Sequence, residues 1–232
     1  MDIVTISDFS QYGNKYFLSI LNDYSRFGWV IFLKTKGEIL NAFKNWYLQI
    51  KNISNINIKH LRTDNGTEFS NNFGNFCNLN GIIHKYTIPY SPQRNERIEQ
   101  LHESLILNAR AMLEEAHLNH VFWEDAIATA NYIHNRIPQK GINNKIPYEL
   151  LYGEKVDFSK FKVFGCQAFF FTFLSNFEIN FPTQLCQVFS LVMITILLLS
   201  EYMILLITKS LSLILLYFLK ILLVIVIPLP LF

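Results

Sequence analysis

Three acidic residues are spaced so that they could share one metal-dependent site: Asp2, Asp64 and Glu99. Asp64 lies where a predicted strand meets the turn Asp64-Asn65-Gly66, and Glu99 lies about two turns into a long predicted helix. Asp2 stands in Met1-Asp2-Ile3-Val4, which is typical of the end of a strand. Clustered carboxylates repel one another unless they bind cations, and their hard oxygens favour Mg²⁺ or Mn²⁺ over Zn²⁺. Two such ions would activate an attacking oxygen and stabilise the leaving oxygen in phosphoryl transfer.

The spacing alone also fits an interpretation without chemistry. In that interpretation Asp64 is a turn residue, Glu99 belongs to a solvated helix face and Asp2 is part of a frayed terminus. His102, three residues after Glu99, could complete a Glu-x-x-His metal pair. The sequence contains no second pair of this kind, which disfavours that role for His102.

The elements that would position the acidic residues alternate between strands and helices. Apolar runs at Tyr16–Leu21 and Trp29–Leu33, with the turn formers Asn22–Gly28 between them, predict a β-hairpin. Two further strands are predicted, one from Ile56 toward Asp64 and one at Ile82–Ile88. The predicted helices are Glu38–Lys51, Asn71–Leu79, a long helix that begins at Ser91-Pro92, and Val121–Asn135. This order indicates an α/β fold with a mixed sheet flanked by helices.

Basic residues near the acidic group are candidates for nucleic-acid binding. The candidate phosphate-binding residues are Arg62, Lys85, Arg94, Arg97 and Arg110, and Tyr90 could stack on a base. The alternatives are solvated surface charges and a packed aromatic ring. The formal net charge of +2 is too small to decide between these interpretations.

Charged residues are distributed unevenly along the 232 residues. Only four of them lie between Phe171 and Phe232, and Ile179–Ser200 is a run of 22 residues without a charge, long enough to suggest a membrane helix. With 51% hydrophobic residues overall, the composition excludes a disordered or collagen-like chain. Three cysteines without close spacing exclude a disulfide scaffold and a cysteine-rich zinc module.

Five short motifs occur in order within the first 170 residues. They are Asn22-Asp23-Tyr24-Ser25-Arg26, Arg62-Thr63-Asp64-Asn65-Gly66-Thr67-Glu68-Phe69, Tyr90-Ser91-Pro92-Gln93-Arg94-Asn95, Ile146-Pro147-Tyr148-Glu149-Leu150-Leu151-Tyr152-Gly153 and Val163-Phe164-Gly165-Cys166. Together they resemble the integrase of copia-type LTR retrotransposon Pol polyproteins, over roughly residues 2–170. The resemblance implies a ribonuclease H-like core with a mixed five-stranded sheet. It also implies a D,D-35-E triad in which Asp2, Asp64 and Glu99 are catalytic residues that bind two Mg²⁺ or Mn²⁺ ions. The implied partners are element-end DNA, target DNA and further copies of the chain.

The sequence departs from the family pattern near the third acid and at its start. Only 34 residues separate Asp64 from Glu99, one fewer than usual, and Glu96 stands where the family usually has glycine. The basic residues that usually follow the third acid are replaced by Gln100, Leu101 and Glu103, so we expect weaker binding of DNA phosphates. Only Met1 precedes Asp2, so we expect a truncated first strand and no upstream zinc-binding domain.

These observations predict three parts of the chain. Residues 1–137 form an integrase core, residues 138–170 form a post-core segment, and residues 171–232 form an apolar tail. We hypothesise that the tail arose by a frameshift near codon 171, and as written it would seek membranes. The predicted function is DNA integration by metal-dependent strand transfer, in a degenerate core. The predicted location is the nucleus or cytoplasm, or a membrane if the tail is translated as written. The alternatives are a non-catalytic nucleic-acid-binding remnant and a small membrane protein.

Overall fold

The computed structural model describes residues 1–54, 56–64, 66, 69, 71–86 and 92–166. Along these residues the elements are β1 (Asp2–Thr5), β2 (Tyr16–Leu21), β3 (Gly28–Leu33), α1 (Ile39–Ser54), β4 (His60–Thr63), α2 (Asn71–Leu79), β5 (Ile83–Tyr86), α3 (Pro92–Glu115), α4 (Trp123–Arg136) and α5 (Pro147–Tyr152). Met1–Ser159 forms one compact unit, and a second unit begins at Lys160. The predicted tail, residues 171–232, lies outside the described residues.

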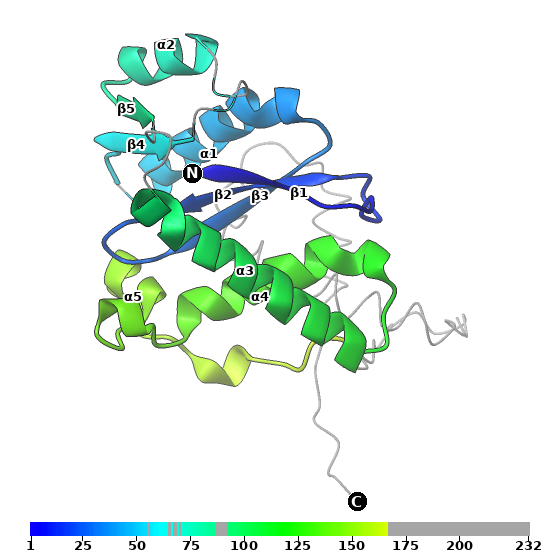
Figure 1. Cartoon of the computed structure of the whole chain (residues 1–232). Helices are drawn as coiled ribbons and strands as arrows, with labels where there is room; N and C mark the ends of the chain where they lie inside the picture. The colour runs from blue at the N-terminus through cyan, green and yellow to red at the C-terminus, as the bar shows by residue number, and fades with distance from the viewer. Residues whose placement is uncertain (55, 65, 67–68, 70, 87–91, 167–232) are drawn as a thin grey trace, which may run out of the picture. The chain divides into compact units, whose positions relative to one another are not determined.

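The strands form two small sheets (Figure 1). β1, β2 and β3 form an antiparallel sheet in that order, and Asp2 of β1 lies opposite Ser19 of β2. β4 and β5 form a parallel pair in which Arg62 lies opposite Lys85. The α/β class is therefore confirmed, but the expected continuous five-stranded sheet is not present in the described part of the chain. Between the two sheets the Met1 nitrogen, just before β1, donates to the Arg62 carbonyl oxygen of β4 at 2.8 Å, but β1 and β4 do not pair as a ladder among the described residues.

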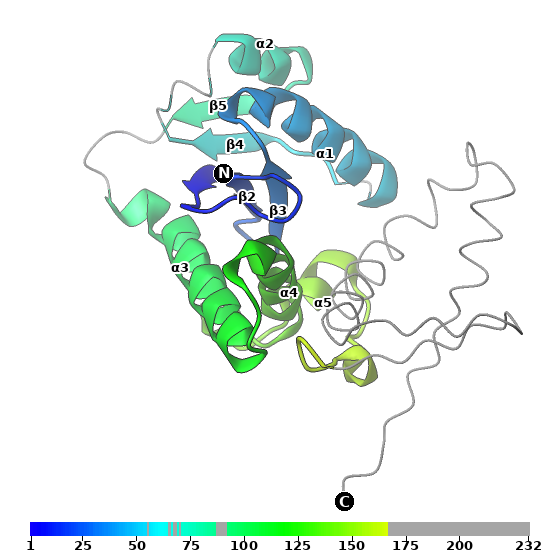
Figure 2. The same cartoon turned by 90° about the vertical axis from the view of Figure 1, so that its right-hand side faces the viewer.

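Helices cover both faces of the antiparallel sheet. On one face an aromatic cluster joins α1 and α2 to the strands, and the ring centroids of Phe43 and Phe73 lie 4.9 Å apart. On the other face a smaller core cluster contains Leu101 and Leu105 of α3 and Ala130 of α4, and Leu21 and Val30 of the strands pack against it. Figure 2 shows α1 on one side of the strands and α3 with α4 on the other. This layering buries both faces of β2 and β3.

Several element boundaries differ from the sequence expectation. β1 continues past Asp2 to Thr5, so Asp2 stands at the start of the strand and not at its end. β4 begins only at His60, although the alternating pattern starts at Ile56. Ile56 and Ile58 do pack against the core, but β5 offers its first pairing residue, Ile83, opposite His60. The extent of β4 is therefore set by its partner strand.

The outer edge of β3 is closed by side chains of α4. Gly28 of β3 lies opposite Leu21 of β2, and the backbone N–H and C=O of Gly28 point away from β2. Its N–H donates to Oδ1 of Asn135 at 2.8 Å, and its carbonyl accepts from Nδ2 of Asn135 at 2.8 Å and from Nδ2 of Asn131 at 3.0 Å. A side chain at position 28 would meet Asn131 Oδ1 at 2.9 Å, which explains the glycine. α4 is thereby fixed against the strand.

The short helix α5 belongs to the same compact unit as the sheets. Pro147 begins the helix, and Gly153 ends it with a left-handed φ of 75°. The helix packs Tyr148 onto the guanidinium of Arg136, which lies 4.6 Å from the centroid of that ring and 3.6 Å from the centroid of the Tyr132 ring. The motif Ile146–Gly153 therefore has a structural role at the end of α4.

Candidate active site

Two of the three predicted acids stand at the ends of neighbouring strands. Asp2 is the first residue of β1, and Asp64 follows β4 directly. The backbone N–H of Ile3 donates to Oδ1 of Asp2 at 2.7 Å, and the N–H of Gly66 donates to Oδ1 of Asp64 at 3.3 Å. These backbone bonds orient both carboxylates.

The backbone segments that carry the two carboxylates are in contact. The Met1 nitrogen, next to Asp2, donates to the carbonyl oxygen of Arg62, two residues before Asp64, at 2.8 Å. The structure therefore places Asp2 and Asp64 on neighbouring segments, although their strands belong to different sheets.

Glu99 is placed differently from the other two acids. It lies on α3, one residue after the buried Ile98, and its side chain is exposed. Among the described residues no three His, Cys, Asp or Glu side chains are gathered as a metal-binding group. Three carboxylates without a cation repel one another, so an outward Glu99 is the electrostatically favoured arrangement.

His102 connects α3 to the strands that carry Asp2. Its ring is buried, and its Nε2 makes a short hydrogen bond with the hydroxyl of Ser19. The same hydroxyl donates to the Asp2 carbonyl at 3.3 Å, which leaves its oxygen to accept from Nε2. His102 Nδ1 lies 3.9 Å from Oδ2 of Asp2. Burial, followed by the nearby Met1 amino group, lowers the pKa of His102 to about 4, so the ring is neutral at pH 7.

The geometry of His102 does not support the Glu99–His102 metal pair. The histidine faces the sheet, whereas the glutamate faces solvent. Sequence reasoning missed Ser19 as its partner. The available signal was a lone hydroxyl within the apolar run Tyr16–Leu21, since a buried polar group requires a hydrogen-bond partner.

The predicted basic residues fall into two groups. Arg62 and Lys85 are register partners on β4 and β5, and both side chains are exposed on one face. Arg97 is exposed at the start of α3, where its Nη1 donates to Oδ1 of Asp23 at 2.9 Å. Tyr90 and the side chain of Arg94 lie outside the described residues. The structure therefore places a basic pair on the parallel sheet and a second basic position on α3.

Comparison with known proteins agrees with this fold. Residues 1–92 match the family described as "Integrase core domain". The Pol polyprotein from transposon TNT 1-94 of Nicotiana tabacum is 37% identical over 158 residues, which are 68% of this chain and 12% of that protein. The Pol polyprotein from transposon RE2 of Arabidopsis thaliana is 26% identical over 155 residues, 67% of this chain and 11% of that protein.

This chain belongs to the integrase core family. The expected copia-type relationship is confirmed, and the chain spans about a tenth of the length of these two relatives. A chain of the simian T-cell lymphotropic virus intasome, solved with the PP2A regulatory subunit B56 gamma, matches with a TM-score of 0.52 at 16% identity. That match covers 67% of this integrase core chain and 55% of the other chain, and it shows that the fold is shared.

The donor chemistry of this integrase core fits a divalent metal. Asp2 and Asp64 offer hard carboxylate oxygens from two segments that are in contact at the Met1–Arg62 bond. Glu99 would supply the third carboxylate from α3.

The described part of the chain contains no helix that is both long and apolar enough to cross a membrane.

Proposed function

We propose that this integrase core catalyses DNA strand transfer that depends on Mg²⁺ or Mn²⁺. In this reaction a DNA 3′-hydroxyl attacks a phosphodiester, a new phosphorus–oxygen bond forms, and the bond to the target's own 3′-oxygen breaks. Bound divalent ions would supply activation of the attacking oxygen and stabilisation of the leaving oxygen.

One observation carries the proposal. Asp2 and Asp64 belong to different sheets, yet the Met1 nitrogen beside Asp2 donates to the Arg62 carbonyl oxygen, two residues before Asp64, at 2.8 Å. Carboxylates on two segments in contact are the hard oxygen ligands that a divalent cation prefers. The backbone N–H groups of Ile3 and Gly66 hold these carboxylates in place, so they need little reorganisation when a cation binds.

The third acid would complete the site from α3. His102 and Ser19 join that helix to β1 and β2, which fixes the part of α3 next to Glu99 relative to Asp2. Because a cation cancels the repulsion between carboxylates, we propose that Glu99 turns toward Asp2 and Asp64 when metal and DNA bind. The chain's own residues thus bind the metal, orient the ligands and anchor the helix.

The test is strand transfer by the full chain on element-end DNA, compared with Asp64→Asn. The asparagine keeps the size of the side chain and removes its charge, so the fold should persist while product formation falls to background. Thermal unfolding supplies a second measurement. Mg²⁺ should raise the unfolding temperature of the unsubstituted chain and not that of Asp64→Asn. Equal product from both proteins would refute catalysis by this site.

The second candidate function is nucleic-acid binding without catalysis. The exposed basic pair Arg62 and Lys85 supports it, since the pair would contact phosphates whether or not the acids bind metal. DNA binding that survives in a chain with no strand transfer would favour this function.

The related intasome chain also leads us to propose that this core assembles with further copies of itself on DNA.

A further inference from the structure

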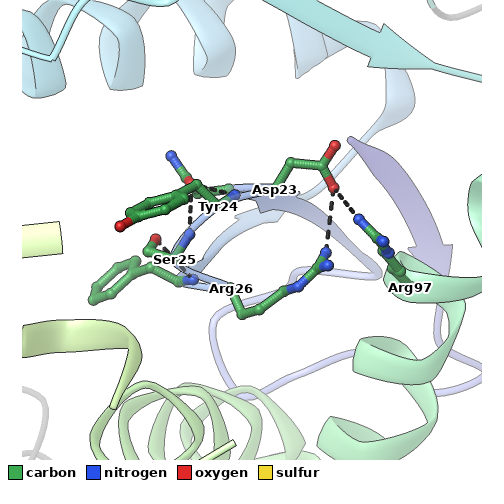
Figure 3. A network of polar contacts seen from close by, with 7 residues as sticks. Asp23, Tyr24, Ser25, Arg26 and Arg97 are labelled. Carbon is green, nitrogen blue, oxygen red and sulfur yellow. Dashed lines mark hydrogen bonds and ion pairs between the residues drawn. The ribbon is translucent and has the colours of Figure 1, made fainter. Parts of the chain in front are cut away.

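A second cluster lies on the loop between β2 and β3, next to the start of α3 (Figure 3). The loop is held tightly. Asn22 Oδ1 accepts from the backbone N–H groups of Tyr24 and Ser25, each at 3.0 Å. Its carbonyl accepts from the N–H of Arg26 at 2.9 Å, and Arg26 takes a left-handed φ of 60°. The loop therefore presents its outward side chains from a fixed backbone.

Two arginines from distant parts of the chain converge on one carboxylate of this loop. Nη1 of Arg26 lies 3.2 Å and Nη1 of Arg97 lies 2.9 Å from the same oxygen of Asp23, Oδ1. Figure 3 shows both guanidinium groups on the carboxylate side of the loop and the ring of Tyr24 on the other side. Two guanidinium groups share one carboxylate oxygen, so this group of three side chains carries a net charge of +1.

This excess charge is not explained by the needs of the fold. One arginine would be enough to hold Asp23, and exposed ion pairs contribute little stability. Burial, and then the positive charge of Arg97, lower the pKa of Arg26, which shows that the two guanidinium groups disfavour each other. An additional anion between them would relieve this repulsion. Arginine presents several N–H donors in a planar fork that matches phosphate oxygens.

The cluster is adjacent to the acids of the candidate active site. Asp23 follows Ser19 by four residues, and Ser19 lies opposite Asp2 in the register of β1 and β2. Arg97 precedes Glu99 by two residues on α3. A DNA strand whose backbone contacts this cluster would therefore pass beside the carboxylates.

We propose that Arg26 and Arg97, held in position by Asp23, bind a phosphate of the DNA backbone beside the acidic site. This inference rests on the proposed function for its ligand, and it adds Arg26 and Asp23, which the sequence motifs did not assign to binding. Asp23 acts as a positioning residue. It keeps both guanidinium groups in one place before DNA arrives, so that less conformational freedom is lost on binding.

The experiment measures binding of a short fluorescent DNA duplex to the full chain by anisotropy, across a series of salt concentrations and with EDTA present. Each phosphate contact contributes about 0.9 to the slope of log K against log salt concentration. Arg26→Gln and Arg97→Gln should each reduce the slope by about that amount. Lys51→Gln is the control, because Lys51 is an exposed basic residue on α1, on the other side of the strands from α3. It should leave the slope unchanged.

Asp23→Asn separates binding from a structural role. It removes the ion pairs but keeps both arginines, so under the proposal its salt slope does not fall. If the arginines only fixed the loop, Asp23→Asn and Arg97→Gln would change binding in the same direction and by similar amounts. That result would overturn the inference, as would an equal effect of Lys51→Gln or a complete lack of DNA binding. EDTA removes divalent metal, so this experiment measures DNA binding without strand transfer. If the chain proves inactive in strand transfer but Arg26→Gln and Arg97→Gln still lower the salt slope, the inference holds and the proposed catalysis fails.

Discussion

Removal of the Asn135 amide should destabilise the core by breaking the contact between α4 and the edge of β3. In Asn135→Ala the Gly28 N–H loses its acceptor, and it lies in a buried position. An unsatisfied buried donor costs about 1–3 kcal/mol. The Gly28 carbonyl loses one of its two donors and keeps Asn131, which adds about 0.5–1.5 kcal/mol. The expected loss is about 2–4 kcal/mol, a large part of the stability of an ordinary domain.

Urea unfolding followed by tryptophan fluorescence measures this loss. All three tryptophans of the chain, Trp29, Trp46 and Trp123, lie within the compact unit and are buried, so they report its unfolding. The midpoint should fall while the denaturant slope stays constant, because the surface exposed on unfolding does not change.

Asn131→Ala is the matched control for the Asn135 prediction. It removes one donor from an oxygen that keeps Asn135 as a partner, so it should cost only about 1 kcal/mol. If Asn135→Ala cost no more than Asn131→Ala, the amide of Asn135 would not be satisfying the strand edge. The reasoning would then be wrong.

Three further predictions concern single side chains. Gly28→Ala should cost about 1–3 kcal/mol of stability, because its methyl group would stand 2.9 Å from Asn131 Oδ1. Gly74→Ala, on α2, should instead stabilise the helix, because its methyl group would meet nothing within 4 Å. Chemical unfolding of the two variants compares their stabilities. Burial raises the pKa of Glu124 above 4.5, so the stability it contributes is present below that value and is lost as pH rises through the raised pKa. Glu124→Gln should therefore gain stability relative to the unsubstituted chain as pH rises, and melting on both sides of that range checks the sign. Arg136→Lys should cost about 1–2 kcal/mol by thermal unfolding, since an ammonium cannot stack on two tyrosine rings as a planar guanidinium does; an unchanged melting temperature would contradict this.

Local patterns predicted the elements that end at strong sequence signals. The hairpin strand Tyr16–Leu21 and the helix Asn71–Leu79 have the predicted bounds. In the second case Asn80-Gly81 ends the helix with Gly81 at a φ of 68°, a conformation that glycine adopts without strain. β4 was misplaced because its length depends on where β5 runs beside it, and no local pattern contains that information.

The three acids of the candidate site stay a prediction, and their arrangement could not be read from the sequence. A motif identified Asp64 and the spacing from it identified Glu99; the structure places the segments of Asp2 and Asp64 in contact and leaves Glu99 exposed. The bond between Ser19 and His102 joins residues 83 positions apart, and the bond between Gly28 and Asn135 joins residues 107 positions apart. Such contacts follow from packing of whole elements, so periodicity in one segment cannot reveal them.

The motifs that relate this chain to integrases serve two separate purposes in the structure. Asn22–Arg26 forms the tight loop after β2, and Ile146–Gly153 forms the capped helix that stacks on Arg136. Neither contributes one of the three acids. Ile146–Gly153 is therefore evidence for the fold, whereas Asn22–Arg26 also carries Asp23 and Arg26, which we propose act in DNA binding. Under the proposed function, activity depends on three carboxylates whose mutual repulsion destabilises the folded chain unless a cation binds. In a copy that had lost activity, stability alone would not preserve Asp2, Asp64 or Glu99, and this chain retains all three.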